Sequence, residues 1–550
     1  MNYDPITICG SDLSIADIAA VSKGAKVTLS NNPIVLGRIR KSRQIIVDAV
    51  RDAQQIYGVT TLFGGMAGVH VKPEQLHNLQ RVALWQHKNT TGPRLPATDV
   101  RAAMLLRANS LMKGVSGIRI EIIERYATFL NAGACPHVYQ RGSIGASGDL
   151  IPLAYIGGSI VGLDPAFKVD LDGETLDSHS ALARLGLQPI ALDPKEGLAL
   201  ANGTGVCTGV AAVCVERAFD LLALSLGVHA LFAQALLATS QSFHPFIHAQ
   251  KPHPGQIWTA LEMAALVDGS KLMRVETAGD RSGRKGQLIQ DRYSLRCLPQ
   301  YIGPIADAVS SVAGQIMIEA NSANDNPLID PETGEIYHTG NFLAQYTAVA
   351  MDQLRYSIGM LAKHIDTQIA LLVTPEFSHG LAPSLVGNVD LGINVGLKSL
   401  QIVGNSLMPL IGFYGQSMAD RYPTHAEQFN QNINSQAMNS ANLARESLDL
   451  FQHYLANALI FGVQAVELRA HATAGAYDAG PCLSPATRGL YAAVRLAAHG
   501  EPQGNRPLVW DDLDGFIQDK VEGVLANISA NGSILQSLGK LRERVRQRAN

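Results

Sequence analysis

The stretch GSIGASGDLIPLA, residues 142–154, places three glycines and two serines directly before an apolar run. Gly148 has no Cβ, so its backbone nitrogen can approach the carbonyl carbon of Ala146 in a turn that other residues would resist. Attack by that nitrogen would close a ring around Ser147, and loss of two waters would leave a methylene group conjugated to an imidazolone. The stretch therefore predicts either a carbon electrophile built from the chain itself or a glycine-rich loop that caps a helix.

Outward from this stretch the sequence is helical nearly throughout. Long helical patterns are expected over residues 206–239, 341–373 and 440–470, each about 30 residues or about 45 Å long. Prolines stand between these patterns, as is typical of helix ends. Three such helices predict a mainly α fold, an elongated bundle that partner chains complete.

Smaller elements are predicted around the bundle. Ser14 and Asp17 resemble a capping box that begins a helix, and Pro33 opens a second helix that runs to Tyr57. The segment FKVDLDGETL, residues 167–176, is the clearest strand signal and predicts a small hairpin with an Asp-Gly turn.

A chain of 550 residues exceeds the usual size of one core, so we expect three parts. Residues 1–190 form an N-terminal subdomain with a lid loop and the segment around Ser147. Residues 191–480 form the central bundle of long helices, and residues 481–550 form a C-terminal helical segment.

The composition narrows the class of protein. Hydrophobic residues make up 47% of the chain and charged residues 17%, with a net charge of −3, which favours extensive subunit interfaces and gives no indication of nucleic-acid binding. Six cysteines without CxxC spacing argue against a disulfide scaffold or zinc ribbon and predict a reducing, cytoplasmic location. The N-terminus lacks the features of a signal peptide. The most apolar stretch, residues 221–238, is interrupted by His229 and Gln234, which predicts a buried helix and no membrane span.

Residues 142–154 resemble the signature of the methylidene-imidazolone ammonia-lyases and aminomutases, the family of the histidine, phenylalanine and tyrosine lyases. The likeness extends along essentially all 550 residues and is greatest to bacterial phenylalanine and tyrosine ammonia-lyases. The resemblance implies the helical fold of the aromatic ammonia-lyases (fumarase/aspartase-like) and a homotetramer whose active sites are shared between chains. It also implies a 4-methylidene-imidazol-5-one formed from Ala146, Ser147 and Gly148, with no external cofactor and no metal.

Elimination of ammonia from an aromatic amino acid needs a base, because an unactivated Cβ–H bond must break. Tyr57, in YGVTTLFGG, is similar to the family's catalytic tyrosine on a mobile, glycine-rich lid loop. A free phenol has a pKa of about 10, so this pKa must be shifted for the group to act near neutrality. Leu62 stands where the family usually has glycine, which leaves the lyase and aminomutase outcomes both open.

The sequence QDRYSLRC, residues 290–297, predicts a clamp for the substrate carboxylate. Gln290, Tyr293 and Arg296 fall about one helical turn apart, so one helix face could present all three. An arginine fork is a natural partner for a carboxylate. The resemblance implies that Arg296 binds the carboxylate and that Tyr293 is catalytic in handling the amine or a proton.

Five further residues have roles implied by the resemblance. Asn202 is similar to the asparagine that hydrogen-bonds the prosthetic ring, and Asn326 is similar to a second carboxylate contact. Phe342 resembles the aromatic residue beside that ring, and Glu427 and Gln431 resemble pocket residues near the amine.

Gln86 and His87 stand at two positions that face the distal edge of the substrate ring in the family. Phenylalanine enzymes usually have an apolar pair there, tyrosine enzymes often place histidine first, and histidine enzymes place it second. Two polar side chains would be poorly satisfied against a bare phenyl ring, whereas a ring hydroxyl could bond to either. We therefore expect tyrosine to be favoured over phenylalanine and histidine, unless Gln86 and His87 bond each other or water.

Other functions stay open at this level. A 2,3-aminomutase would use the same electrophile and return the amine to Cβ, a histidine ammonia-lyase would give urocanate, and an inactive helical scaffold would keep only the fold. A metal hydrolase is a further rival, because His244 and His248 have metal-like spacing. Pro245 and Pro254 disrupt a common helical face, however, and no glutamate follows as in HExxH.

Overall fold

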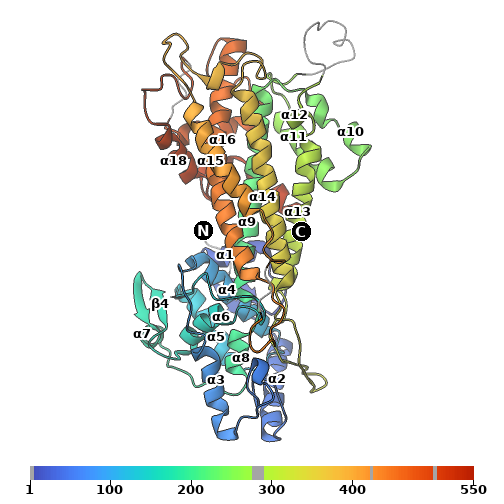
Figure 1. Cartoon of the computed structure of the whole chain (residues 1–550), viewed down its shortest axis with the longest axis vertical. Helices are drawn as coiled ribbons and strands as arrows, with labels where there is room; N and C mark the ends of the chain where they lie inside the picture. The colour runs from blue at the N-terminus through green and yellow to red at the C-terminus, as the bar shows by residue number, and fades with distance from the viewer. Residues whose placement is uncertain (1–4, 275–289, 422–424, 500–504, 550) are drawn as a thin grey trace. The chain divides into compact units, whose positions relative to one another are not determined.

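The computed structural model describes residues 5–274, 290–421, 425–499 and 505–549 (Figure 1). The chain divides into two compact units. The first unit comprises residues 1–216, 312–353 and 417–445, and the second comprises residues 217–311, 354–416 and 446–550. Each unit is assembled from segments that lie far apart in the sequence. The expected boundaries between three parts, near residues 190 and 480, stay a prediction.

The first unit is mainly helical, with three small sheets in its described residues. Its helices are α1 (Ile15–Ser22), α2 (Pro33–Arg51), α3 (Leu76–Trp85), α4 (Ala97–Met112), α5 (Ile120–Ala132), α6 (Leu150–Val161), α7 (Ser178–Arg184) and α8 (Glu196–Ala201), with 3-10 turns at Gly64–Met66 and Pro73–Gln75. Two parallel strands are β1 (Ile6–Ile8) and β2 (Val27–Leu29). The antiparallel strands are β3 (Cys135–Pro136), β4 (Lys168–Leu171) and β5 (Glu174–Asp177), in that order, and the pair β6 (Leu328–Ile329) and β7 (Ile336–Tyr337).

Four long helices contribute residues to both units: α9 (Gly205–Ala235), α13 (Leu298–Ala320), α14 (Gln345–Leu372) and α16 (Ala437–Ala474). The other helices of the second unit are α10 (Pro245–Ala249), α11 (Pro254–Val267), α12 (Tyr293–Arg296), α15 (Lys398–Tyr414), α17 (Pro485–Ala497), α18 (Ile517–Asn527), α19 (Ser533–Ser537) and α20 (Gly539–Ala549), with 3-10 turns at Ser240–Phe243 and Pro383–Leu385. The prediction of a mainly α fold is confirmed.

Local sequence signals explain several element boundaries. The Ser14 side chain accepts from the amide of Asp17 at 3.1 Å, and the Asp17 carboxylate accepts from the amide of Ser14 at 2.9 Å, so the predicted capping box begins α1. In the β4–β5 hairpin, Asp172 and Gly173 have φ of 53° and 80°. Two successive residues of positive φ are what a two-residue type I′ turn requires, and the predicted Asp-Gly hairpin is confirmed.

The helices also differ from expectation in places. The three predicted long helices are present as α9, α14 and α16, with shifted ends. The helix that begins at Pro33 ends at Arg51 and not at Tyr57, because Ala53 has a φ of 54°, a left-handed conformation that stops a helix. The sequence does not indicate α13 and α15, since Pro304 and Pro409 lie inside them and proline usually ends a helix.

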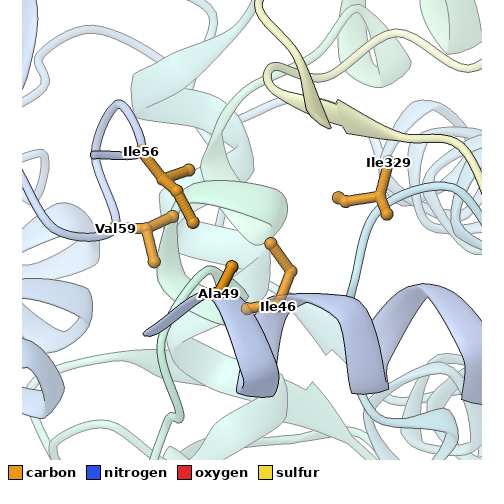
Figure 2. Packing of buried hydrophobic residues seen from close by; sticks show 5 residues of the cluster. All are labelled: Ile46, Ala49, Ile56, Val59 and Ile329. Carbon is orange, nitrogen blue, oxygen red and sulfur yellow. The ribbon is translucent and has the colours of Figure 1, made fainter. Parts of the chain in front are cut away.

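A hydrophobic cluster in the first unit anchors the chain on both sides of Tyr57 (Figure 2). Ile56 and Val59 are at most 1% exposed and pack with Ile46, Ala49 and Ile329, which belong to α2 and β6. Burial of each isoleucine or valine side chain contributes roughly 1.5–3 kcal/mol to stability. The backbone at Tyr57 is therefore held by core packing.

Candidate active site

A cavity of about 410 Å³ in the first unit collects most of the predicted site residues. Binding sites for small molecules commonly have volumes of about 300–1,000 Å³. Ten predicted residues line this cavity: Tyr57, Gln86, His87, Ala146, Ser147, Asn202, Asn326, Phe342, Glu427 and Gln431. They come from separate stretches of sequence, so the fold brings them together.

Gly148 holds the tight turn before α6 and packs directly on Gly203. It has a φ of 70°, and its backbone pairs with that of Gly203 in an isolated parallel bridge. A Cβ at Gly148 would overlap the carbonyl group of Gly203, so only glycine fits. The amide of Asp149 donates to the same carbonyl at 2.7 Å. Residue 203 thus holds the turn over residues 146–148 from outside.

Ser147 is held at both its side chain and its backbone. Its Oγ lies 2.9 Å from Nε2 of Gln431, which donates to it, and its carbonyl accepts from Nδ2 of Asn202 at 2.8 Å. Oδ1 of Asn202 is buried and has no hydrogen-bond partner among the described residues. An imidazolone ring built from residues 146–148 fits these surroundings. The unpaired Oδ1 of Asn202 can accept a hydrogen bond beside it, and glycine stands at the position whose nitrogen must join the ring.

Two helices begin beside Ser147. Leu150 starts α6, and Asp149 accepts hydrogen bonds from the amides of Val206 and Cys207, in the first turn of α9, at 3.1 and 2.7 Å. Burial raises the pKa of Asp149, while these amides and the Ser143 hydroxyl act against that rise. The amino ends of two helices favour negative charge on groups near this turn.

Tyr57 reaches the cavity from the segment anchored by the hydrophobic cluster. Its hydroxyl oxygen accepts a hydrogen bond from the amide of Gly64 at 2.9 Å, and its ring meets Phe63 edge to face. Burial raises the pKa of the phenol, and the negative charge of Glu427 raises it further, although the Gly64 amide lowers it. Within one chain the phenol is therefore protonated at neutral pH, and its use as a base requires its pKa to be lowered, by a nearby positive charge or by hydrogen-bond donors to the oxygen.

Glu427 meets the predicted lid at Gly64. A Cβ at Gly64, which has a φ of 58°, would overlap the Glu427 carboxylate. Burial raises the pKa of Glu427. The lid and the loop that carries Glu427 are in direct contact, so the position of one constrains the other.

Gln86 and His87 follow the last residue of α3. Nδ1 of His87 lies 2.8 Å from the carbonyl oxygen of Ala83, so Nδ1 carries the proton and donates it. Burial lowers the pKa of His87, and the neutral imidazole then keeps a lone pair on Nε2. The cavity therefore has a hydrogen-bond acceptor at the position predicted to face the substrate ring.

Gln290, Tyr293 and Arg296 belong to the second unit, whereas every residue that lines the cavity belongs to the first. The helix α12 covers only Tyr293–Arg296, and Gln290 lies outside it at a bend. The expectation that all three share one helix face is therefore wrong for Gln290. Tyr293 is 73% exposed, and the Arg296 guanidinium lies over its ring at 4.7 Å.

Comparison with known proteins identifies the family. Residues 13–496 match the family of aromatic amino acid lyases. The chain belongs to this family. This aromatic amino acid lyase is 63% identical over 538 residues to the aromatic ammonia-lyase of Loktanella atrilutea, with 98% of each chain covered. It is 56% identical over 535 residues to the phenylalanine ammonia-lyase of Nostoc punctiforme, covering 97% of this chain and 94% of the relative.

A solved structure agrees with this assignment. The tyrosine aminomutase of Streptomyces globisporus has a TM-score of 0.87 to this lyase at 30% identity, covering 98% of this chain and 99% of that one. The chain is a carbon–nitrogen lyase. Its family and relatives support elimination of ammonia from an aromatic amino acid.

Several cavity residues of this aromatic amino acid lyase were not indicated by the sequence. They are mostly apolar or small: Phe63, Ala83, Leu150, Leu198, Ala201, Gly340, Leu343, Asn430 and Ile433. Most of them lie within a few residues of a predicted one, as Asn430 does beside Gln431, so their proximity was the available signal. The residue type of Leu198 gave no sign of a place in the cavity, because a leucine in a helix is usually a packing residue.

The histidines with metal-like spacing are bonded to this lyase's own chain. His244 accepts from the amide of Phe246 at 3.2 Å at the start of α10. Nδ1 of His248 lies 3.1 Å from Nε2 of Gln256, and its Nε2 lies 3.0 Å from the carbonyl oxygen of Ser242. Within the described ranges, no group of three or more histidine, cysteine or acidic residues is placed to hold a metal ion.

The apolar stretch at residues 221–238 lies mostly in α9. No helix in the part of the chain that the structure describes combines the length and the apolar character needed to cross a membrane.

Proposed function

We propose that this lyase eliminates ammonia from an aromatic L-amino acid to give the trans-arylacrylate, with tyrosine favoured over phenylalanine. The observation that carries the proposal is the cavity that both Ser147 and Tyr57 line, beside a Gly148 turn that no other residue could adopt. A 4-methylidene-imidazol-5-one formed from residues 146–148 supplies an electrophilic methylene carbon for the substrate amine. Asn202 and Gln431 are the residues that hold this segment.

Tyr57 is assigned the removal of the β-proton. Its backbone is anchored by the packing of Ile56 and Val59, so the phenol is attached to a rigid stretch of backbone. Its pKa is raised by burial, and a cation brought next to it would lower that pKa. A positive charge from elsewhere is proposed to lower this pKa, because the described residues that line the cavity include no lysine or arginine.

Arg296 is proposed to supply that charge from a second copy of the chain, in a homotetramer with shared active sites. Its guanidinium would also bind the substrate carboxylate, with Tyr293 and Gln290 beside it and Asn326 contacting from the cavity side. The exposure of Tyr293 and the low fraction of charged residues, 17%, support an assembly of this kind. We further propose that the enzyme is cytoplasmic.

His87 is proposed to select the ring. The lone pair on Nε2 can accept the proton of a phenolic hydroxyl, whereas a bare phenyl ring offers it nothing. Phe342 would lie beside the ring, and Glu427 and Gln431 would lie near the amine. Phenylalanine and ring-oxygenated analogues stay possible substrates, and histidine is a weaker candidate.

The proposal is tested with the intact protein and its Ser147→Ala variant. We expect the wild-type mass to be two waters below that of the encoded chain, and the variant to lose both this difference and its turnover. L-tyrosine, L-phenylalanine and L-histidine are compared as substrates, and free ammonium is measured against β-amino acid. Full turnover by the Ser147→Ala variant would overturn the mechanism, tyrosine as the poorest substrate would overturn the preference, and β-amino acid as the main product would identify an aminomutase.

A further inference from the structure

Gln80 of α3 is a fully buried amide that touches two parts of the proposed active site without lining the cavity. Its Nε2 donates to the carbonyl oxygen of Gly58 at 3.0 Å, and its Oε1 accepts from the amide of Leu198 at 3.2 Å. Gly58 directly follows Tyr57, and Leu198 lies in α8, the helix that ends just before Asn202. One side chain therefore joins the segment of the base to the helix that leads to the residue bonded to Ser147.

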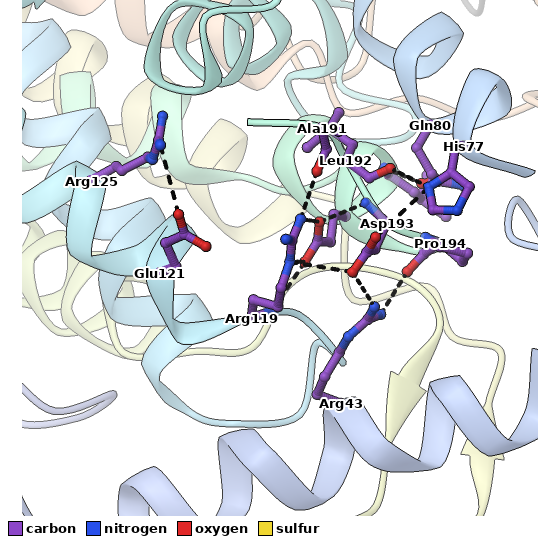
Figure 3. Close-up of polar contacts among 12 residues, drawn as sticks. Arg43, His77, Gln80, Arg119, Glu121, Arg125, Ala191, Leu192, Asp193 and Pro194 are labelled. Carbon is purple, nitrogen blue, oxygen red and sulfur yellow. Dashed lines mark hydrogen bonds and ion pairs between the residues drawn. The ribbon is translucent and has the colours of Figure 1, made fainter. Parts of the chain in front are cut away.

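The α8 end of this link is fixed by a charge network (Figure 3). Arg119 pairs with the fully buried carboxylate of Glu196, the first residue of α8, at 2.6 Å. Arg43 of α2 pairs with Asp193 at 2.7 Å, and His77, on the same helix as Gln80, lies 3.0 Å from the carbonyl oxygen of Leu192. The segment before α8 is thus tied to residues on or next to three other helices, and Gln80 extends from this fixed base to Gly58.

The Gly58 end of the link has little freedom to shift without moving Tyr57. Gly58 has a φ of 65°, and a Cβ there would come within 2.7 Å of the Leu198 side chain and 2.8 Å of Phe63. The hydrogen bond from Gln80 fixes the orientation of the peptide group that joins Gly58 to Val59. A displacement of about 1 Å in a reacting group can cost about 100-fold in rate.

We propose that Gln80 is a positioning residue that sets the Tyr57 phenol relative to the segment around Ser147. This inference rests on the proposed function of Tyr57 as the base. Gln80 does not touch the substrate, so its loss should disturb the proton-transfer step more than the binding of substrate.

The first test is Gln80→Leu, which removes both the donor and the acceptor at nearly unchanged volume. We expect kcat to fall about 10- to 100-fold with KM within about twofold, because the interaction matters chiefly in the transition state. The kinetic isotope effect with β-deuterated substrate should rise, since removal of the β-proton becomes more rate-limiting.

Gln464→Leu is the matched control. Gln464 is also 0% exposed and also bridges backbone groups, donating to the carbonyls of Leu385 and Val509 at 3.0 and 2.9 Å and accepting from the Val509 amide at 2.9 Å. It lies in the second unit, outside the cavity lining. Both variants should lower the melting temperature, but the control should leave kcat and the isotope effect unchanged.

Gln80→Glu provides a second, pH-dependent readout, for which the folded fraction is measured at each pH because a buried carboxylate also destabilises the fold. A protonated carboxyl can donate to the Gly58 carbonyl and accept from the Leu198 amide, as the amide does, whereas a carboxylate can only accept. The ratio of variant to wild-type kcat should therefore rise as the pH falls.

A Gln80→Leu kcat no lower than that of Gln464→Leu would overturn the positioning role, and so would a flat ratio for Gln80→Glu over a pH range in which the new carboxyl is shown to lose its proton. The two proposals fail separately. A wild-type protein without the loss of two waters and without turnover overturns the proposed function. An active wild type, an inactive Ser147→Ala variant and an unaffected Gln80→Leu variant overturn only the inference on Gln80.

Discussion

The cavity and the segment at residues 290–296 carry residues predicted for one site, yet the chain positions them in opposite ways. In the first unit, Tyr57 and Ser147 turn into a common cavity and bond to their own chain, at the Gly64 amide and at Gln431. In the second unit, Tyr293 is 73% exposed. One chain therefore gathers the proposed electrophile and the proposed base in one cavity, and it leaves Tyr293 of the proposed carboxylate clamp exposed.

The segment around Tyr293 is nevertheless firmly anchored. Asp291, whose side chain is 5% exposed, accepts from the amide of Thr239 at 2.7 Å and pairs with the guanidinium of Arg274. Nε2 of Gln368, a buried residue of α14, donates to the carbonyl oxygen of Ser294 at 2.7 Å. These inward contacts hold the backbone while the intervening side chain of Tyr293 stays exposed, which is compatible with the proposed shared site.

The largest expected effect tests the buried side of the comparison. Tyr57→Phe removes the proposed base and should lower kcat by about 100- to 10,000-fold, the usual range for a general base. Tyr126→Phe is the control, because the Tyr126 hydroxyl is buried with no hydrogen-bond partner among the described residues. Steady-state kinetics of both variants decide the matter, and equal activities would remove Tyr57 from the mechanism.

The segment around Tyr293 is tested by Arg296→Ala. Loss of one charge-assisted contact to a carboxylate should raise KM about 10- to 100-fold, and loss of the positive charge proposed to lower the pKa of Tyr57 should lower kcat as well. Co-expression with Tyr57→Phe should produce mixed oligomers that are more active than either variant, because some sites then combine a wild-type Tyr57 with a wild-type Arg296. If activity only equals the average of the two variants, the sites are not shared.

A smaller effect is expected from the anchor of the segment around Tyr293. Asp291→Asn weakens the pair with Arg274 and should lower kcat/KM about tenfold, which corresponds to about 1.4 kcal/mol. Asp220→Asn is the matched control, since Asp220 is 9% exposed and pairs with Arg542 at 2.7 Å in the same unit. The melting temperature should fall similarly in both variants. An equal loss of kcat/KM in the control would therefore show that Asp291 contributes only to general stability.

The smallest effect concerns the pH dependence of Tyr57. Glu427 raises the pKa of the phenol by its negative charge, so Glu427→Gln should lower that pKa and move the acid limb of the kcat profile to lower pH. The sign follows because the deprotonated phenol is the base form. The total rate can fall as well, so the position of the limb is the readout. A limb displaced to higher pH would contradict the electrostatic link between the two residues.

The sequence predicted features that depend on a few adjacent residues. The Asp172-Gly173 turn, the capping box at Ser14 and the mainly α fold follow from local conformational rules, and the cavity residues followed from the resemblance of short motifs. Helices with an internal proline were missed, because packing can outweigh the hydrogen bond that a residue such as Pro304 loses.

Contacts between distant residues were beyond these rules. Lys195 and Asp325 form an ion pair at 2.7 Å with both side chains 0% exposed, although 130 residues separate them in the sequence. Gln80 likewise carries no motif, since a glutamine on a helix gives no sign that it will be buried between two backbone segments. Which predicted site residues fall in which unit depends on such contacts and could not be predicted from spacing alone.

The contact between Gly148 and Gly203 has a consequence for the order in which folding and ring formation can occur. The turn at Gly148 packs on the carbonyl of Gly203, which stands just before α9 and more than fifty residues later in the sequence, so we expect the turn to form only after residue 203 has been synthesised. A nascent chain that has been synthesised only as far as the Ala-Ser-Gly tripeptide should therefore carry it as an ordinary, unreactive peptide. An electrophilic carbon formed from these residues would thus appear only after the surrounding fold is in place, and that fold would shield it from the thiols and amines of the cell.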